Sequence, residues 1–211
     1  LGICLDGDAD RVTIIDEKGR IANGDQLLAV FAKELMLKKK LNSNSVVATS
    51  MSNLGLEKFL MSQGVELLRT DVGDRYVVER MRKNGINLGG EQSGHIIFSD
   101  FSTTGDGLIA SLQFLAAMQG NKSSASELLN LYKPYPQLLM NIRFDQNNNP
   151  LNDKGIQNLI REKERLFSEI GRIVIRKSGT ESLIRVMGEH EDFSILQDTI
   201  REIAHDIENF G

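Results

Sequence analysis

The chain has 211 residues, of which 40% are hydrophobic and 26% are charged, with a formal net charge of −4. That length allows one or two domains with buried cores, and the mild acidic excess argues against a nucleic-acid-binding protein, which needs basic surface to neutralise phosphates. No apolar run reaches the roughly 18 residues of a membrane-spanning helix, so no membrane contact is expected. The single cysteine, Cys4, excludes an internal disulfide and fits a reducing cytosol.

The chain opens on an apolar segment, residues 1–5, which reads as a β-strand and in which we expect Cys4 to be buried. Because a natural protein rarely begins in the middle of a strand, we expect these residues to be part of a longer protein. A second strand is predicted over residues 12–15, where β-branched side chains predominate.

Three aspartates, Asp6, Asp8 and Asp10, occupy alternate positions of the loop between these strands. A cluster of carboxylates suits a hard cation such as Mg²⁺ or Ca²⁺, and without a cation the charges would repel one another. Arg11 would then place a positive group beside the metal, where it can contact a phosphate and assist the chemistry. An EF-hand loop, which needs glycine where Arg11 stands, and a solvated acidic turn without metal are the alternatives.

Beyond a turn at residues 16–19, strands alternate with helices. Helix caps and apolar periodicity predict helices over 26–39, 53–63, 74–83, 106–119 and 125–131. Short strands are predicted over 45–49, 65–69, 86–88 and 96–98. This alternation predicts an α/β layer architecture with a mixed or mostly parallel sheet.

A glycine-rich loop over residues 89–95 presents Glu91, Ser93 and His95 at alternate positions, so an extended loop would point all three the same way. A carboxylate and a hydroxyl together can accept and donate hydrogen bonds to sugar hydroxyls. The alternative is an ordinary turn with a surface glutamate. Residues 71–75 could line the same site, but a helix cap is the preferred interpretation.

Residues 132–136 hold two of the three prolines and read as a linker. The order of elements then changes to strand (138–144), helix (153–167), two strands (172–176 and 183–188) and helix (193–209), which predicts a small α+β unit. His190 and His205 are expected at the surface with no chemical role.

The segment 176–181, with Arg185 further on, combines basic side chains with a Ser-Gly-Thr turn. Consecutive backbone N–H groups of such a turn, together with the hydroxyls of Ser178 and Thr180, make a nest for an anion. Arg176 and Arg185 can add charge-assisted bonds to phosphate oxygens. The alternative is a hairpin turn with incidental basic residues.

The order Asp-Gly-Asp-Ala-Asp-Arg, Gly-Glu-Gln-Ser-Gly-His and Arg-Lys-Ser-Gly-Thr-Glu, with its spacing, resembles the α-D-phosphohexomutase superfamily over essentially the whole chain. Gln92 and the run over 72–77 resemble the phosphoglucosamine mutases of that superfamily. The superfamily usually has proline where this chain has Lys177 and Ser182, which leaves the donors of the nest unchanged.

The resemblance implies a mixed-sheet α/β domain of α-D-phosphohexomutase type followed by a small α+β C-terminal domain. Residues 1–20 would end the second of four domains, 21–133 would form the third and 134–211 the fourth, and the missing N-terminal domains would be partners of this chain. A homodimer is a candidate assembly. On the acidic loop, Asp6, Asp8 and Asp10 would hold Mg²⁺. On the glycine-rich loop, Glu91, Ser93 and His95 would bind the phosphosugar. On the last loop, the phosphate of that sugar would be held by Arg176, Ser178, Gly179, Thr180 and Arg185.

The resemblance also implies the reaction, which interconverts glucosamine 6-phosphate and glucosamine 1-phosphate through a phosphoserine enzyme and a bisphosphate intermediate. This isomerase activity would serve amino-sugar nucleotide and cell-wall precursor synthesis in the cytoplasm. The superfamily's phosphoserine stands in a Ser-His-Asn-Pro-type loop that these residues lack, so we expect the chain alone to be inactive. A phosphoglucomutase or phosphomannomutase, or a non-catalytic module that binds metal and phosphosugar, are the alternatives.

Overall fold

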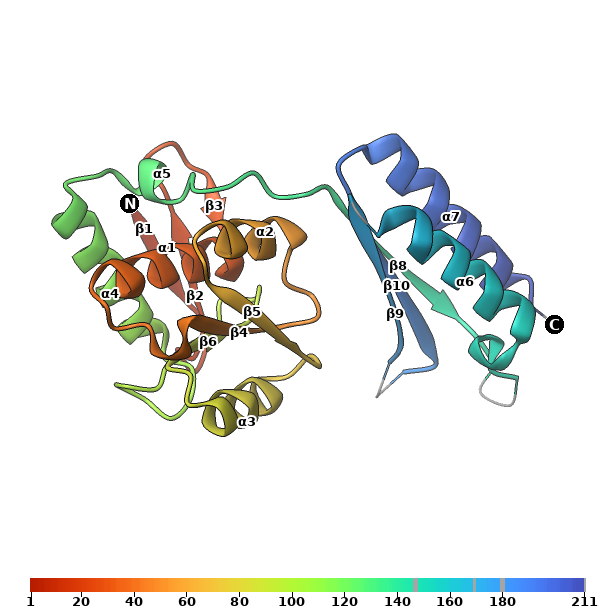
Figure 1. Cartoon of the computed structure of the whole chain (residues 1–211), viewed down its shortest axis with the longest axis horizontal. Helices are drawn as coiled ribbons and strands as arrows, with labels where there is room; N and C mark the ends of the chain where they lie inside the picture. Colours follow the sequence, from red (N-terminus) through yellow and green to blue (C-terminus); the bar gives the residue numbers. More distant parts are fainter. Residues whose placement is uncertain (146–147, 169, 179–180, 211) are drawn as a thin grey trace. The chain divides into compact units, whose positions relative to one another are not determined.

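A computed structural model describes residues 1–145, 148–168, 170–178 and 181–210. The chain divides into two compact units, Leu1–Pro134 and Tyr135–Gly211 (Figure 1), and this boundary falls within the segment that reads as a linker. No helix in the described ranges is long and apolar enough to cross a membrane.

The first unit begins with a small antiparallel sheet in the order β1 (Gly2–Leu5), β2 (Val12–Ile15) and β3 (Ile21–Ala22). The acidic loop is the connection between β1 and β2. The prediction that Cys4 is buried is wrong, because β1 is an edge strand of this sheet and Cys4 is exposed.

A second, four-stranded sheet has the order β5 (Glu66–Thr70), β4 (Ser45–Thr49), β6 (Leu88–Gly90) and β7 (Ile96–Phe98). β4 runs parallel to β5 and β6, whereas β7 is antiparallel to β6. The mixed sheet is therefore confirmed. Every residue of β4 is buried, as expected for a strand that is covered on both faces.

Helices cover the two faces of this sheet. On one face, α1 (Gly24–Leu37), α2 (Leu54–Ser62) and α4 (Gly107–Asn121) pack over Val46 and Ala48, while α3 (Asp74–Asn84) packs over Val47 on the other. A 3-10 turn (Asn42–Asn44) and the short α5 (Ala125–Leu128) complete the unit. The helices begin within about two residues of the expected positions because side-chain caps fix their first turns; those caps are Asn23, Asn53, Asp106 and Ser124.

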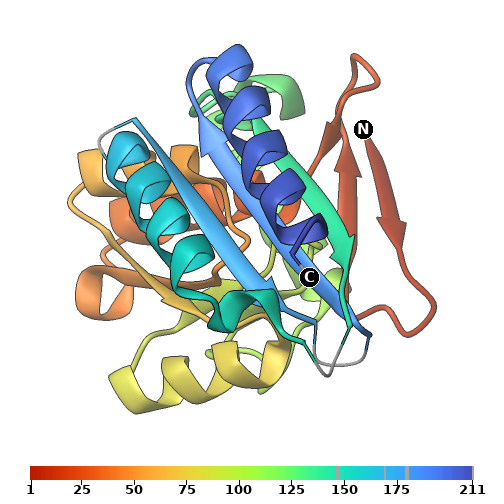
Figure 2. The same cartoon turned by 90° about the vertical axis from the view of Figure 1, so that its right-hand side faces the viewer.

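The second unit is an antiparallel sheet in the order β8 (Gln137–Arg143), β10 (Leu183–His190) and β9 (Gly171–Lys177). A 3-10 turn (Pro150–Asn152) precedes α6 (Lys154–Phe167), and α7 (Phe193–Glu208) ends the unit. The two helices lie side by side on one face of the sheet (Figure 2), which confirms the α+β prediction.

The surface position predicted for His190 is wrong. Only 2% of this residue is exposed, and its ring lies 4.8 Å from that of Phe167, centroid to centroid. Its Nδ1 accepts a hydrogen bond from the backbone N–H of Asp192, the N-cap residue of α7. His190 therefore joins the end of β10 to the last helix.

Candidate functional site

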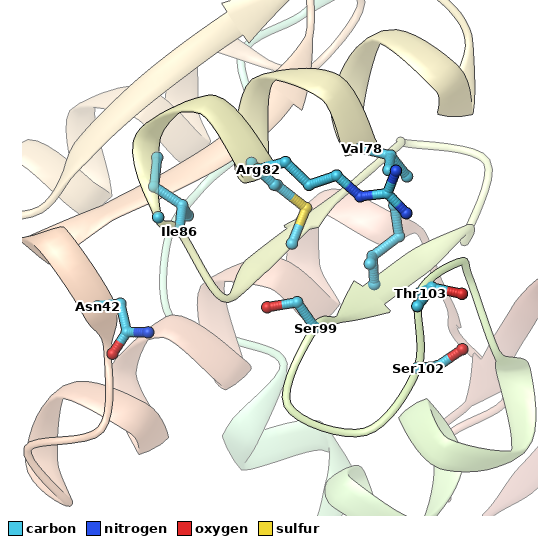
Figure 3. Close-up of a pocket in the computed structure, with 10 residues that line it drawn as sticks. Asn42, Val78, Arg82, Ile86, Ser99, Ser102 and Thr103 are labelled. Carbon is cyan, nitrogen blue, oxygen red and sulfur yellow. The ribbon is translucent and has the colours of Figure 1, made fainter.

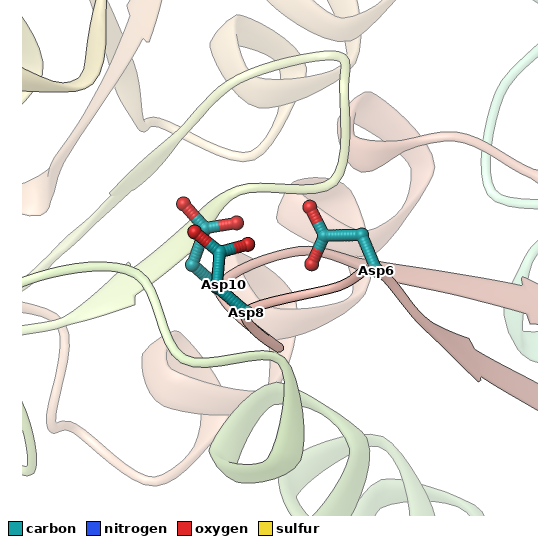
Figure 4. Close-up of side chains that lie close together, drawn as sticks. All are labelled: Asp6, Asp8 and Asp10. Atoms are coloured by element: carbon teal, nitrogen blue, oxygen red, sulfur yellow. The ribbon is translucent and has the colours of Figure 1, made fainter.

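The three aspartates of the β1–β2 loop meet at one point (Figure 4). One carboxylate oxygen from each of Asp6, Asp8 and Asp10 lies within 4.8 Å of the others. Opposite ligands of Mg²⁺ are about 4 Å apart, so small side-chain rotations suffice for all three to bind one ion. Ala9, between them, has a φ of 59°, an uncommon left-handed conformation for a residue with a β-carbon that often marks a functional site.

Asp10 shows how well this loop fits a cation. Its Oδ2 lies 3.0 Å from Nδ1 of His95, but its Oδ1 is buried and has no hydrogen-bond partner among the described residues. Its ion pair with Nε of Arg11, at 3.8 Å, is too long for a hydrogen bond, so a bound Mg²⁺ would give this buried oxygen a direct ligand contact. The donor set, oxygen atoms only, is the one that Mg²⁺ prefers.

Arg11 lies directly beside the cluster. Its Nε is 3.8 Å from an oxygen of Asp6 and 3.8 Å from one of Asp10, and its backbone N–H donates to Oδ1 of Asp6. The side chain is 52% exposed, so the guanidinium remains accessible to an anionic ligand. The structure thus places the Arg11 guanidinium beside the three predicted metal ligands.

His95 is held behind the acidic loop by both of its ring nitrogens. The backbone N–H of Gly105 donates to Nε2 at 3.1 Å, which assigns the ring proton to Nδ1, where it is donated to Asp10. The side chain is 3% exposed. This geometry lets a neutral His95 orient Asp10, as imidazoles and carboxylates around metals commonly do, and its direct contact with a substrate stays a prediction.

The acidic loop and the glycine-rich loop are joined by backbone contacts. Arg11 and His95 form an antiparallel β-bridge, and the N–H of Val12 donates to the carbonyl of Gly94 at 3.1 Å. Gly94 has a φ of 92°, and a β-carbon there would overlap the carbonyl oxygen of Val12. Only glycine permits this close approach, which fixes one loop against the other.

Within the glycine-rich loop, Glu91 and Ser93 lie together as predicted. Oε1 of Glu91 accepts a hydrogen bond from the backbone N–H of Gly73, the N-cap residue of α3, at 3.0 Å. The hydroxyl of Ser93 lies 3.4 Å from Oε2 of the same carboxylate, and Ser93 is exposed. The helix N-terminus favours the negative charge of Glu91, so residues 71–75 both cap α3 and support this carboxylate.

The predicted phosphate loop lies at one end of the sheet of the second unit. Arg176 on β9 and Arg185 on β10 are direct cross-strand partners, on the face opposite the helices, because Ile184 and Val186 on either side of Arg185 point into the helix-covered core. Like charges in this position repel each other, which a bound anion would relieve.

Ser178 is buried next to this arginine pair. Its N–H donates to the carbonyl of Leu183 at 2.7 Å, and its hydroxyl accepts from the N–H of Glu181 at 3.3 Å. Glu181 is also 3.4 Å from Nη2 of Arg185. Gly179 and Thr180, also predicted to bind phosphate, lie outside the described residues.

Sequence reasoning missed two polar residues of this sheet face. Asn141 on β8 is the cross-strand partner of Arg185, Arg143 is that of Leu183, and both are exposed. The sequence pattern that could have revealed them is their alternation with the buried Ile142, which places both on the solvent face of the strand. With Arg176 and Arg185, they make this face basic and rich in hydrogen-bond donors.

A separate pocket of about 330 Å³ lies between α3 and the loop over residues 99–103 (Figure 3). Arg82, Ser102 and Thr103 line its rim, and Met81 and Ile97 contribute apolar surface. None of the residues that the sequence singles out for metal, sugar or phosphate lines it. This pocket is therefore not part of the candidate site.

Residues 23–135 match the family described as phosphoglucomutase/phosphomannomutase, alpha/beta/alpha domain III, and residues 139–207 match its C-terminal domain. The chain belongs to the phosphoglucomutase/phosphomannomutase family. This membership confirms the resemblance that the three loops indicate.

Among family members, the phosphoglucosamine mutase of Roseobacter denitrificans is 55% identical over 97% of this chain and 45% of its own length. That of Parvibaculum lavamentivorans is 54% identical over 99% of this chain and 46% of its own length. The chain thus spans a little under half the length of the curated relatives that it matches.

Solved structures of the same fold have lower sequence identity. The N-acetylphosphoglucosamine mutase of Aspergillus fumigatus matches all of this chain and 49% of its own with a TM-score of 0.81 at 20% identity. A phosphoglucomutase/phosphomannomutase family protein from Burkholderia thailandensis matches 99% of this chain and 47% of its own, with a TM-score of 0.78 and 23% identity. Another A. fumigatus structure, with 20% identity and a TM-score of 0.78 over 98% of this chain and 52% of its own, is a complex with GlcNAc-6P and magnesium.

Proposed function

We propose that the intact protein, the full product of the gene that encodes this chain, is a phosphoglucosamine mutase. It interconverts glucosamine 6-phosphate and glucosamine 1-phosphate through a phosphoserine and a bisphosphate intermediate. The observation that carries the proposal is the Arg11–His95 β-bridge, which joins the acidic loop to the glycine-rich loop. The candidate cation site therefore lies on the same part of the first unit as Glu91 and Ser93. The relatives named phosphoglucosamine mutase, at 54–56% identity, support the choice of sugar.

Each side chain has a defined task in this reaction. Glu91 accepts hydrogen bonds from sugar hydroxyls and Ser93 both donates and accepts them, which orients the sugar. Arg11 faces the phosphoryl group and offsets its negative charge. Asp6, Asp8 and Asp10 would hold Mg²⁺, which supplies charge neutralisation at the phosphoryl oxygens when bound. The neighbour that binds GlcNAc-6P and magnesium supports these two classes of ligand.

The second unit would bind the phosphate that is not being transferred. Arg176 and Arg185 offer forked donors to its oxygens, the hydroxyl of Ser178 is a further candidate contact, and Gly179 and Thr180, outside the described residues, stay predicted contacts. A bisphosphate carries a phosphate at each end, so this loop can hold either end in turn. The loop therefore serves both half-reactions.

Several further assignments belong to this proposal. Residues 1–20, 21–133 and 134–211 would be parts of the second, third and fourth domains of the intact enzyme, and the phosphoserine would stand in another part of that protein. The product would enter amino-sugar nucleotide and cell-wall precursor synthesis in the cytoplasm. A homodimer stays a prediction.

A substrate panel on the intact protein tests the proposed function. With Mg²⁺ and a bisphosphate activator, we expect kcat/KM for glucosamine 6-phosphate to exceed the values for glucose and mannose phosphates. A preference for glucose or mannose phosphate would instead assign a phosphoglucomutase or phosphomannomutase.

The isolated 211-residue chain provides the second arm of this test. We expect it to bind Mg²⁺ in calorimetric titration but to convert no glucosamine 6-phosphate, because it has no Ser-His-Asn-Pro-type loop. Turnover by this chain alone would contradict the phosphoserine mechanism. Binding without any turnover by the intact protein would favour a non-catalytic binding module.

A further inference from the structure

A buried carboxylate, Asp25, lies behind the glycine-rich loop at the second position of α1. None of its surface is exposed. Its Oδ2 accepts a hydrogen bond from the backbone N–H of Asn53, the N-cap residue of α2, at 2.8 Å, and another from Nε2 of Gln92 at 3.2 Å. One oxygen of Asp25 thus connects the start of α2 to the glycine-rich loop.

The backbone of the same loop residue is held by the neighbour of Asp25. The N–H of Gly24 donates to the carbonyl of Gln92 at 2.9 Å, and a β-carbon on Gly24 would overlap the carbonyl oxygen of Glu91. Two consecutive residues of α1 therefore hold Gln92 by its backbone and by its side chain. One N–H of the Gln92 amide is thus directed toward the helix.

Three helix N-termini meet the loop in this way. Asp25 bridges the first turns of α1 and α2, and Glu91 accepts from the N-cap N–H of α3. Burial raises the pKa of Asp25, whereas the hydrogen bonds from Asn53 and Gln92 and the charge of Arg69 act in the opposite direction. Because helix N-termini stabilise carboxylates, they also offset the unfavourable burial of Asp25.

We infer that Asp25 and Gln92 are positioning residues that set where Glu91 and Ser93 meet the substrate's hydroxyls. Neither residue acts on the substrate itself: Asp25 fixes Gln92, and Gln92 fixes the loop between the two sugar-binding side chains. The identity of the ligand rests on the proposed function, but the anchoring of the loop rests on the contacts of Asp25, Gly24 and Gln92 alone.

The replacement Gln92→Met in the intact protein tests this inference, because methionine keeps the length of the side chain and loses the donor. We expect KM for glucosamine 6-phosphate to rise about tenfold, the effect of losing one hydrogen bond to a charged group, while kcat falls less. The matched control is Gln119→Met, at an exposed position of α4, away from the glycine-rich loop and from the first turn of α1. It should leave KM unchanged.

A second pair of variants separates positioning from stability. Asp25→Ala alone should raise KM and speed amide hydrogen exchange over residues 91–94, and adding Gln92→Met should raise neither much further, because the two variants break the same hydrogen bond. A fall in melting temperature with KM and loop exchange unchanged would assign Asp25 a structural role only and overturn the inference.

The hydrogen-exchange comparison also keeps the two proposals distinguishable. If the wild-type intact protein converts no phosphosugar, the proposed function fails, and loop exchange in Gln92→Met still decides whether the loop is anchored. If the wild-type protein is active but Gln92→Met retains the wild-type KM and loop exchange, the inference fails and the proposed function stands.

Discussion

The site regions of the two units differ in how their charged groups are held. In the first unit, Asp10, Glu91 and Asp25 each accept a hydrogen bond from a fixed protein donor. In the second unit, Arg176 and Arg185 face each other across neighbouring strands as like charges. The first region is ordered by hydrogen bonds from fixed protein donors, whereas the second brings two like charges together, of which Arg185 is also paired with Glu181.

This contrast separates two ways of binding one substrate. Preorganised groups determine geometry and lose little freedom on binding, which suits the recognition of sugar hydroxyls. A cationic face attracts any phosphate with less regard to the rest of the ligand, which would suit a loop that accepts both ends of a bisphosphate in the proposed reaction. The two regions should therefore respond differently to salt, metal and mutation.

The largest effect is expected from Asp8→Asn in the acidic loop. Loss of a ligand should lower Mg²⁺ affinity by more than the about 10–100-fold typical of changes around a metal's ligands, with nearly complete loss of mutase activity. The sign of the stability effect should depend on metal. In EDTA the variant relieves carboxylate repulsion and should melt higher than wild type, whereas with Mg²⁺ it should melt lower.

Calorimetric titration and melting curves with and without Mg²⁺ measure both effects. Asp198→Asn, on α7 in the second unit, is the control for the loss of one negative charge. Equal melting shifts for Asp8→Asn in EDTA and in Mg²⁺ would contradict a metal site at this loop.

Arg185→Ala should have the next largest effect. Loss of charge-assisted bonds to phosphate should raise KM about 10–100-fold, and the salt dependence of KM should weaken because one cation of the site is gone. Folding stability should change little, since the variant removes both the like-charge pair with Arg176 and the ion pair with Glu181. The exposed Arg201→Ala on α7 is the control, and an equal rise in KM for both variants would contradict a local phosphate site.

His95→Phe should have a smaller effect, on the metal rather than on the phosphate. The variant removes the donor that orients Asp10 and should lower Mg²⁺ affinity about tenfold, within the range for residues that orient metal ligands. Calorimetric titration measures it. A KM that rises at saturating Mg²⁺ while metal affinity is unchanged would favour instead the direct substrate contact predicted for His95.

The smallest effect concerns acid stability of the first unit. Burial raises the pKa of Asp16, but hydrogen bonds from Arg20 and Lys18 outweigh it and hold the pKa below its usual range. A lowered pKa gives stability that is present above the unfolded-state value and lost as the pH falls through the folded-state value. Asp16→Asn should therefore melt lower than wild type at pH 7 and converge with it as the pH falls through the folded-state pKa of Asp16. A constant difference from pH 7 to pH 3 would contradict this account.

Local signals predicted most of the fold. Asn23 and Gln26 form a reciprocal capping box at the start of α1, and Asp153 caps α6, so the sequence identified where these helices start. Pairing of strands far apart in the chain has no such local signal, and the order β5-β4-β6-β7 follows only from the folded structure. For the same reason, the edge position of β1 and the exposure of Cys4 could not be foreseen.

The sequence predicted which residues belong to the candidate site, but not which of the distant ones contact each other. Alternation correctly indicated that Asp6, Asp8 and Asp10 converge, because short-range geometry decides it. That His95 would face Asp10, 85 residues away, depends on how two loops pack. Asp25 was missed because an acidic residue in the first turn of a helix ordinarily needs no explanation beyond the helix dipole.

Gly24 bears on how this chain can diverge. A side chain at this position would collide with the backbone of Glu91. Almost every substitution there should therefore disrupt the glycine-rich loop and be lost by selection, whatever its effect on substrate choice. Mutational change in sugar preference must then arise elsewhere: at exposed positions such as Ser93, or on the open sheet face of the second unit. The first turn of α1 keeps the loop's path constant while the groups around it vary.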